Sequence, residues 1–582
     1  MGDRIKIIVG VDYGTTFTGV SYTTSDKASV DDIVVVKTWP GPGAPVEGNW
    51  KTPTVIAYGS ENGQDRNSWG YQVVPNMKSC SWTKLLLDTS AETAEYDDPS
   101  LREAAGSSLL RLPPGKDAQT ACQDFLKEIY DFLVRSLKAK MGAEVFHITP
   151  MECYLTMPAI WTDKAQAATR NAAIGAGFGS RSFDTIRMIT EPEAAAIATL
   201  KRDLRPNSIN AAKPGDNILI LDCGGGTVDI TTYTITRTYP QIGFEEICAG
   251  AGGKCGSTYI DRNFHKLMVE RFGSSFQNVL PKRKAPGSKL MRSFEKAKQS
   301  FGSFESDEFL IESPVMDGVN RPEYYDEEES TIKLSKADMV RLFDPVMKEI
   351  RRLVEDQVEK ARRQKSKNIS LIVLVGGFGN SDYLKMEIDN WCRSRGIKCI
   401  RPDFCQAAVV RGAAIRGLEG TMPSKLICRR HYGFTWGEVF RPGIDKEENA
   451  FYIFGTKFCR GFIKWMMTKG SEITATTSSL VDVQRAWSPG ESYVFTDTLY
   501  TCNLDSAPNR IEGPRVVYAG TISMDFTGVG MSLFEKRPTS SGMEYKLEYQ
   551  LKIEFRSQDG VLKYSSVVNG RTIGTTTIDF NE

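Results

Sequence analysis

Short apolar runs that end in glycine-containing turns are the most regular pattern in residues 1–420. Residues 7–11 and 218–221 are two such runs, each too short for a helix and typical of a buried strand. Elsewhere in this part, apolar positions recur every three or four residues, as in an amphipathic helix. These patterns predict helices over residues 122–140, 162–175, 191–200, 260–272, 288–301, 345–360 and 409–417, and strands over 145–157, 186–190, 233–248 and 371–375.

The pattern changes from about residue 423 onward, where Thr, Val, Tyr, Phe and Gly dominate. Residues 545–555 alternate between apolar and polar side chains, which predicts a strand with one face in a core. A turn at 558–560 and the pair Asn569 and Gly570 predict hairpins leading to strands over 561–568 and 571–580. We therefore expect a separate, sandwich-like β domain.

The two apolar runs of the first part end in similar polar turns. In each, an aspartate is followed by small residues: Asp12 by Gly14, Thr15 and Thr16, and Asp222 by Gly224, Gly225, Gly226 and Thr227. Such turns bring bare N–H groups to a phosphate, and an aspartate at the strand end suits a hydrated Mg²⁺. One copy alone could be a glycine hairpin with a solvated aspartate. Two copies indicate duplicated domains that grip a polyphosphate from both sides.

Three further features are candidates for the same site. Glu191 stands where a predicted strand runs into a helix, a common place for active-site carboxylates, although the helix dipole alone favours a charge there. The glycine-rich residues 249–261, which include Gly256 and Ser257, feed a helix and are a second candidate phosphate contact. Lys84 precedes an apolar run, and a lone lysine is most often a solvated charge.

Composition limits the class of protein. The 582 residues are 41% hydrophobic and carry a formal net charge of +1, which gives no electrostatic reason for a nucleic-acid or membrane partner. The apolar runs are far too short to span a membrane, and no signal peptide is expected. Twelve cysteines without a CxxC pair and only three histidines argue against zinc or a disulfide framework, so we expect a cytoplasmic protein.

With these residues considered together, the chain resembles the DnaK-like heat-shock chaperones of the actin, sugar-kinase and chaperone ATPase superfamily. Residues 10–16 and 221–227 look like that family's two phosphate loops, 191–197 and 402–414 its two connecting motifs, and 374–377 its adenosine motif. The resemblance covers roughly residues 5–420. It implies an α/β fold, an actin-like ATPase of two duplicated αβ lobes around a nucleotide cleft.

The resemblance also implies roles for individual residues. Asp12 and Asp222 would bind Mg²⁺ through water, Thr15, Thr16 and Thr227 would contact phosphate or the attacking water, and Glu191 would order that shell. Lys84 matches the family's catalytic lysine, so the resemblance favours a catalytic role over a solvated surface charge. The catalytic set is Lys84, Glu191, Asp222 and Thr227, and the nucleotide set is Gly14, Thr15, Thr16, Gly224, Gly225, Gly226, Gly256, Ser257, Glu295, Lys298, Gly376, Gly377 and Asp403.

Departures from the family pattern are concentrated around the adenosine. Gln299 and Asn380 stand where the family has arginines, and Gly302 where it has a serine, so nucleotide affinity should be weaker or differently tuned. The family's acidic, leucine-rich linker is absent, and we expect no helical lid after Glu582. The chain thus resembles a divergent, lidless branch of the kind found in fungi and animals.

We therefore expect lobe I at residues 1–203 with an inserted subdomain at about 35–125, lobe II at 204–420 with one at about 245–345, and the β-rich domain at 421–582. The leading hypothesis is a slow ATPase that binds ATP or ADP with Mg²⁺ and couples nucleotide state to a protein client or regulatory partner. A non-hydrolysing ATP sensor or scaffold and, less favoured, a small-molecule kinase are the alternatives.

Overall fold

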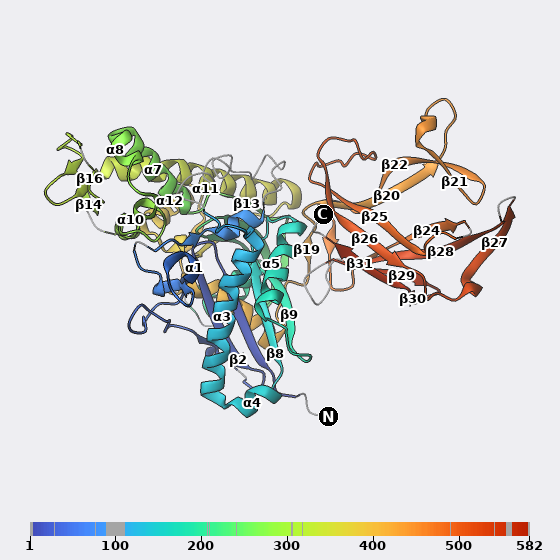
Figure 1. Cartoon of the computed structure of the whole chain (residues 1–582), viewed down its shortest axis with the longest axis horizontal. Coiled ribbons are helices and arrows are strands. Elements are labelled where there is room, and N and C mark those ends of the chain that lie inside the picture. The colour runs from blue at the N-terminus through green and yellow to red at the C-terminus, as the bar shows by residue number, and fades with distance from the viewer. Residues whose placement is uncertain are drawn as a thin grey trace. The chain divides into compact units, whose positions relative to one another are not determined.

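The computed structural model describes residues 4–579 except 28, 76, 89–110, 206, 207, 209, 240, 304, 305, 317, 489, 540, 541 and 555–561. The chain divides into two compact units (Figure 1). The first comprises residues 1–161 and 168–423, and the second comprises residues 162–167 and 424–582.

The first sheet of the first unit is built around β1 (Ile7–Tyr13), which is buried along its whole length. It pairs antiparallel with β2 (Phe17–Thr24) and parallel with β8 (Met151–Met157). The order of strands is β3-β2-β1-β8-β9, where β3 is Val34–Val35 and β9 is Thr185–Thr190. Burial on both faces explains why β1 reads as a continuous apolar run.

The second sheet repeats this arrangement around β10 (Asn217–Cys223). That strand pairs antiparallel with β11 (Val228–Arg237) and parallel with β17 (Leu371–Val375). The order is β12-β11-β10-β17-β18, where β12 is Gly243–Glu246 and β18 is Lys398–Ile400. The central strands of the two sheets, β1 and β10, therefore each lead into one of the two similar turns.

Two helices rich in small residues share one core with both sheets. They are α6 (Glu191–Arg202) and α13 (Ala408–Glu419), and the core includes Ile8 of β1 and Ile220 of β10. The helices are very close, since a Cβ on Gly412 would lie 1.7 Å from the carbonyl oxygen of Ala194. This close packing ties the two sheets together behind the turns.

The other elements of the first unit surround these sheets. Its remaining helices are α1 (Gly59–Asn62), α3 (Ala118–Met141), α4 (Ala143–Ile148), residues 168–176 of α5 (Asp163–Ala176), α7 (Thr258–Phe272), α8 (Ser274–Gln277), α9 (Pro281–Lys284), α10 (Lys289–Ser300), α11 (Lys336–Lys365) and α12 (Asp382–Arg393). Its remaining strands are β4 (Thr52–Pro53), β5 (Val55–Ala57), β6 (Ser68–Trp69), β7 (Cys80–Ser81), β13 (Ala251–Gly253), β14 (Glu308–Glu312), β15 (Tyr325–Asp326) and β16 (Thr331–Ser335).

Three sequence predictions in this unit were wrong in part. The strand expected over 233–248 ends with β11 at Arg237, and the chain turns back into the antiparallel strand β12 at Gly243–Glu246. The strand expected over 145–157 begins only at Met151, because Gly142 at φ +85° ends α3 and residues 143–148 form α4. The helix expected to begin at Pro345 begins at Lys336 and carries the proline inside it. Ser335 caps that helix by accepting from the N–H of Asp338, a start signal that the proline obscured.

The second unit is made of β-strands, drawn in orange and red in Figure 1. One sheet has the order β21-β22-β20-β25-β26-β31, and the other has β24-β28-β29-β30 with β27 beside β28. Both sheets contribute to one buried cluster, for example Phe434 and Leu551. The strands are β19 (Leu426–Ile427), β20 (His431–Val439), β21 (Ala450–Ile453), β22 (Thr456–Met467), β23 (Glu472–Ile473), β24 (Ser478–Trp487), β25 (Val494–Cys502), β26 (Val516–Asp525), β27 (Phe534–Thr539), β28 (Gly542–Glu554), β29 (Lys563–Val568), β30 (Arg571–Ile573) and β31 (Thr575–Asp579).

The alternating strand predicted over 545–555 is confirmed as β28, with Leu547, Leu551 and Ile553 buried. Asn569 and Gly570 both have positive φ, as the predicted hairpin turn requires. The strand predicted over 571–580 divides instead at Gly574, where β30 stays with β29 and β31 joins β26 in the other sheet. Phe555 and the turn predicted at 558–560 lie outside the described residues. Within the described residues, no helix has both the length and the apolar character needed to cross a membrane.

Candidate functional site

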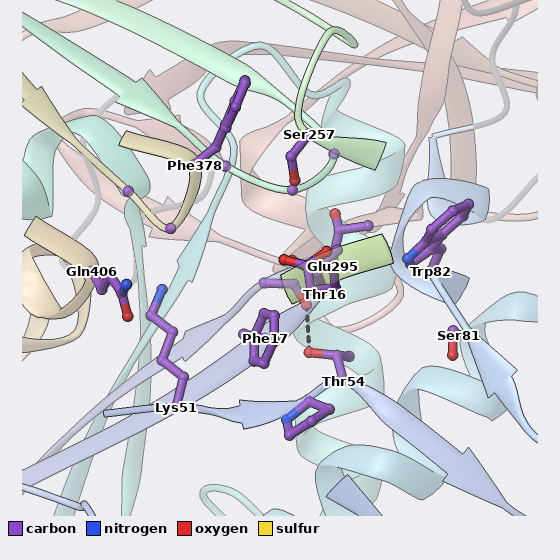
Figure 2. Close-up of a pocket in the computed structure, with 18 of the residues that line it drawn as sticks. Thr16, Phe17, Lys51, Thr54, Ser81, Trp82, Ser257, Glu295, Phe378 and Gln406 are labelled. Atoms are coloured by element: carbon purple, nitrogen blue, oxygen red, sulfur yellow. Dashed lines mark hydrogen bonds between the residues drawn. The ribbon is translucent and has the colours of Figure 1, made fainter. Parts of the chain in front are cut away.

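A cavity of about 630 Å³ in the first unit receives the turns that follow β1 and β10 (Figure 2). Most of the predicted site residues line it: Asp12, Gly14, Thr15, Thr16, Lys84, Glu191, Asp222, Gly224, Gly225, Gly226, Thr227, Ser257, Glu295, Lys298, Gly376 and Gly377. Gly256 and Asp403 are not among the lining residues, and Asp403 is exposed. Residues from at least six separate segments thus meet at one cavity.

The two turns face each other at close range. A Cβ on Gly225 would lie 2.2 Å from Oγ1 of Thr16, and one on Gly226 would lie 2.5 Å from Oγ1 of Thr15. Only glycine fits such distances, so these positions require it for the approach of the turns. The arrangement places small residues and backbone of both sheets on the same part of the cavity.

The start of α7 braces the second turn. The N–H of Gly256 donates to the carbonyl of Gly226 at 3.2 Å, and that of Thr258 donates to Gly225 at 2.9 Å. The N–H of Gly256 therefore stabilises the turn and does not point to a ligand in the cavity. Ser257, between them, does line the cavity.

Four carboxylates gather where the central strands end. Asp12 is the second-last residue of β1, Asp222 the second-last residue of β10, Glu191 the first residue of α6, and Asp229 lies on β11. Burial raises the pKa of Glu191 to about 7, with Asp12 and Asp229 adding to the shift and Lys84 opposing it. Burial also raises the pKa of Asp222 well above its usual value, and Glu191 is the next largest cause. The cluster is therefore short of positive charge.

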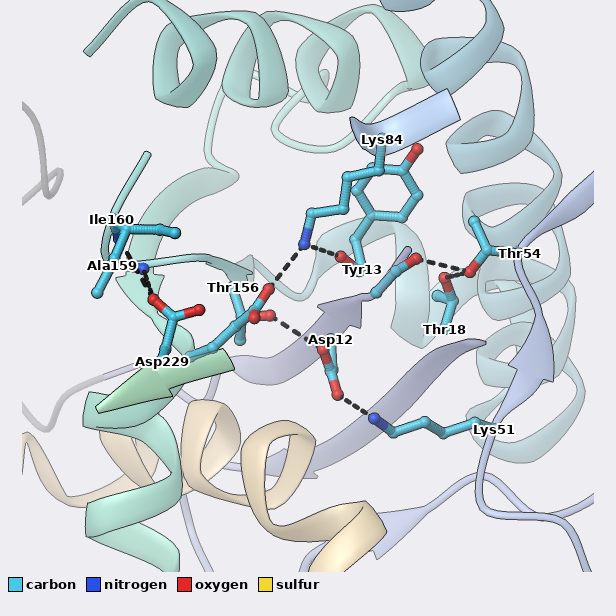
Figure 3. Close-up of polar contacts among 12 residues, drawn as sticks. Asp12, Tyr13, Thr18, Lys51, Thr54, Lys84, Thr156, Ala159, Ile160 and Asp229 are labelled. Atoms are coloured by element: carbon cyan, nitrogen blue, oxygen red, sulfur yellow. Dashed lines mark hydrogen bonds and ion pairs between the residues drawn. The ribbon is translucent and has the colours of Figure 1, made fainter. Parts of the chain in front are cut away.

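Lys84 is a fully buried cation beside this cluster (Figure 3). Its Nζ donates to Oε1 of Glu191 at 2.7 Å and also to the carbonyl of Tyr13, the last residue of β1. A buried lysine is held in place by such partners, because an unpaired buried charge is very costly. The structure thus places Lys84 inside the site, not on a solvated surface.

The sequence analysis missed two residues of the cluster. Lys51 lies just before β4, and its Nζ is 2.5 Å from Oδ2 of Asp12. Asp229 accepts from the N–H groups of Ala159 at 2.8 Å and Ile160 at 3.3 Å (Figure 3). A signal existed for Asp229, since it follows the glycine turn and lies only two residues after Thr227. No local signal marked Lys51.

Further residues of the cavity lining come from α10 and from the segment after β17. Lys298 on α10 pairs with Asp261 at 2.8 Å and with Glu295 at 2.5 Å. Gly376 has φ +90°, and a Cβ there would lie 2.3 Å from Oδ1 of Asp222, so glycine is required. This backbone lets the residues after β17 pass close to Asp222.

The three departures noted in the sequence differ in where they lie. Gln299 and Asn380 line the cavity, and Gln299 donates to Glu295 at 2.9 Å. Gly302 is not among the lining residues; its φ is +92°, and a Cβ would lie 2.6 Å from the backbone nitrogen of Tyr383. A serine at 302 would therefore be strained in this chain.

Comparison with known proteins is consistent with this geometry. The family model described as Hsp70 protein matches residues 114–425, which is more than half of the chain. Over 90% of this chain and 85% of the relative, the sequence is 24% identical to the heat shock 70 kDa protein 12A of Mus musculus. It is 23% identical to the human heat shock 70 kDa protein 12B over 89% of this chain and 84% of that protein.

A bacterial relative matches over a shorter stretch. The chaperone protein DnaK of Elusimicrobium minutum is 28% identical over 48% of this chain and 41% of its own length. The family model, the relatives and the paired turns around one cavity agree. The chain belongs to the Hsp70 family and carries that family's actin-like ATP-binding domain.

Proposed function

We propose that this cavity binds ATP or ADP with Mg²⁺, that it hydrolyses ATP slowly, and that nucleotide state is coupled to a protein partner through the β-rich unit. One observation carries the proposal: the two glycine turns face each other in the cavity that also holds the Lys84–Glu191 pair. Phosphoryl transfer needs mostly positioning and neutralisation of charge, which such an arrangement supplies. On the sequence grounds given above, we also propose a cytoplasmic location.

The carboxylates suit a hydrated Mg²⁺. Asp222 is 5% exposed, it lines the cavity, and no hydrogen bond or ion pair of its carboxylate is found within the described residues. Among those residues, no three His, Cys, Asp or Glu side chains form a group that could hold a metal directly. These facts favour an ion that keeps most of its water shell, as Mg²⁺ commonly does. When bound, Mg²⁺ would neutralise charge on the phosphates.

The chain's own residues would provide the rest of the chemistry. The turns at Gly14–Thr16 and Gly224–Thr227 would hold the phosphate chain from both sides with N–H and hydroxyl groups. Lys84 would stabilise charge that develops on the transferred phosphoryl group. Glu191, held by Lys84 at 2.7 Å, would order the attacking water with Thr227.

Residues of α10 and of the segment after β17 would hold the nucleoside. Glu295 and Lys298 of α10 and the residues Gly376 and Gly377 line the cavity. Gln299 and Asn380 line it too, in place of the arginines of the family pattern. Since both changes remove a cation that could stack on a base, we expect nucleotide affinity below that typical of the family.

The coupling to a partner rests on the second unit. In the described residues, β21 and β31 are the outermost strands of its larger sheet. Outer strands offer unpaired N–H and C=O groups, so an extended segment of a client or regulatory protein could pair with them. We propose that this unit reads out the nucleotide state of the first.

A non-hydrolysing ATP sensor is the second candidate, favoured by the changed residues Gln299 and Asn380 in the cavity. Incubation with γ-labelled ATP and Mg²⁺ separates the readings by their product. Free labelled phosphate supports the ATPase, and intact ATP recovered from the protein supports the sensor. A labelled small molecule would contradict both and indicate a kinase.

A further inference from the structure

Lys51 enters the cavity from a segment that is not part of either turn. It precedes β4, whose residues Thr52 and Pro53 pair with Thr18 and Phe17 of β2. Figure 2 shows its side chain extended into the cavity, with Gln406 and Phe17 to either side in this view. The pairing of β4 with β2 therefore fixes where the lysine begins.

A glycine gives the side chain its path to Asp12. Gly19 is the residue of β2 directly opposite Asp12 in the pairing of β1 and β2. A Cβ on Gly19 would lie 3.3 Å from Cγ of Lys51, tighter than ordinary contact. The lysine stem thus passes over a position without a side chain, and Nζ reaches Oδ2 of Asp12 at 2.5 Å.

The ammonium group of Lys51 is largely buried beside Asp12. Its side chain is 12% exposed and that of Asp12 is 4% exposed. Burial disfavours the charged form of Lys51, yet its pKa lies above the ordinary value because Asp12, and more weakly Asp222 and Glu191, favour the cation. Lys51 therefore acts on carboxylates of both sheets.

A count of charges shows what the cluster lacks. Asp12, Glu191, Asp222 and Asp229 contribute −4 when ionised, and Lys51 and Lys84 contribute +2, which leaves −2. Lys84 is held at both Glu191 and the Tyr13 carbonyl. Within the described residues, the recorded hydrogen-bond partner of Lys51 Nζ is Asp12 alone.

From these contacts we propose that Lys51 is a phosphate-binding residue, which neutralises Asp12 while the cleft is empty and turns to the nucleotide's phosphates when the nucleotide binds. The proposal rests on the proposed function, binding of ATP in this cavity. Lysine suits such an exchange, because a flexible four-carbon stem carries a single point charge that binds phosphate. The turns that would hold the phosphates line the same cavity as Lys51.

Two consequences follow for binding. Without a divalent cation, the charge of the phosphates has to be met by the chain itself, and Lys84 is already held by Glu191 and the carbonyl of Tyr13. ATP binding in EDTA should therefore depend on Lys51. With Mg²⁺ present, the ion and Lys51 compete for Asp12, so removal of the lysine lowers the Mg²⁺ concentration that promotes ATP binding. A lysine that only fills space beside Asp12 would produce neither effect.

The test is isothermal titration calorimetry of ATP into the nucleotide-free full chain, in excess EDTA and across a series of Mg²⁺ concentrations. Lys51→Met keeps the stem and removes the charge, and Lys51→Gln is a second, polar variant in case the first does not fold. Lys51→Arg keeps the charge. Lys27→Met removes an exposed lysine after β2 and is the matched control.

In EDTA we expect Lys51→Met and Lys51→Gln to weaken ATP binding by about tenfold or more, the loss of one charge-assisted hydrogen bond. Lys51→Arg should stay within about threefold of the parent, and Lys27→Met should match it. The Mg²⁺ concentration that gives half of the maximal increase in ATP affinity should be lower in Lys51→Met than in the parent. Parent-like binding by Lys51→Met and Lys51→Gln in EDTA would overturn the proposal while leaving the proposed function intact. If the parent itself binds no ATP in either condition, the proposed function fails, and this inference with it.

Discussion

The ammonium nitrogen of Lys84 lies 2.7 Å from Oε1 of Glu191, although 107 residues separate the two in the sequence. Lys84 is 1% exposed, and it also donates to the carbonyl of Tyr13 at the end of β1. Glu191 begins α6, which packs against both sheets. The ion pair with Glu191 and the hydrogen bond to Tyr13 thus let Lys84 connect α6 to the end of β1 at the cavity.

We predict that Lys84→Ala lowers ATP turnover by about two to three orders of magnitude, the usual effect of removing one preorganised group that stabilises developing charge. ATP affinity should change far less, because the interaction is stronger in the transition state. Single-turnover release of phosphate, with ATP binding measured in parallel, checks this. Lys127→Ala, which removes an exposed lysine of α3, is the control. Parent-like turnover in Lys84→Ala would favour the sensor reading.

Asp222→Asn should weaken nucleotide binding in Mg²⁺ more than in EDTA, because the amide keeps the shape of the carboxylate but not its charge. Asp12→Asn should do the same. Asp65→Asn, on the exposed surface near α1, should leave binding unchanged. Calorimetric titration of ATP with and without Mg²⁺ measures the difference. If both cavity variants keep the parent's Mg²⁺ dependence, the metal assignment is wrong.

In the nucleotide-free protein, the contribution of Glu191 to the free energy of unfolding should fall as pH rises. Burial holds the folded pKa of Glu191 at about 7 against 4.5 for the ordinary side chain, so the folded state binds more protons between these values. The free energy of unfolding therefore falls as pH rises through that window. Glu191→Gln removes this contribution, and its melting temperature relative to the parent should rise from about pH 5 to about pH 8. An equal difference at both pH values would contradict the raised pKa.

Gly225→Ala should force the two turns apart, since its Cβ would lie 2.2 Å from Oγ1 of Thr16. We expect a loss of about 1–3 kcal/mol in unfolding free energy, as for other overpacked sites, and weaker ATP binding. Gly43→Ala is the control, because no atom lies within 4 Å of its Cβ. Adding Thr16→Ala should restore part of the stability. Additive effects of the two changes would show that the turns do not press on each other.

Much of the core of the first unit could be predicted because its signals are local. A buried strand such as β10 reads as an apolar run, and α3 shows Phe125, Ile129 and Leu133 on one face. Element starts were less certain where two local signals competed. Pro345 suggested a helix start, but the cap at Ser335 makes the helix begin at Lys336, nine residues before that proline.

The carboxylates and glycines of the site could be named from their place at strand ends and in turns. Lys51 could not, because the pairing of β4 with β2 brings it to Asp12 across 39 residues of sequence. Likewise, no local pattern shows that Gly256 presses on Gly225 and serves the turn. Both contacts depend on how distant segments pack. The contact of Lys51 with Asp12 also changes the charge of the site.

Calorimetric binding of ATP, ADP and AMP in Mg²⁺ tests most directly the claim that the two turns grip a polyphosphate. All three share the nucleoside, but AMP lacks the phosphate chain that the turns at Gly14–Thr16 and Gly224–Thr227 would hold. We predict that one ATP or ADP binds per chain, each at least about tenfold more tightly than AMP. If AMP binds as tightly as ATP, or if ATP does not bind, the account of this cleft is contradicted.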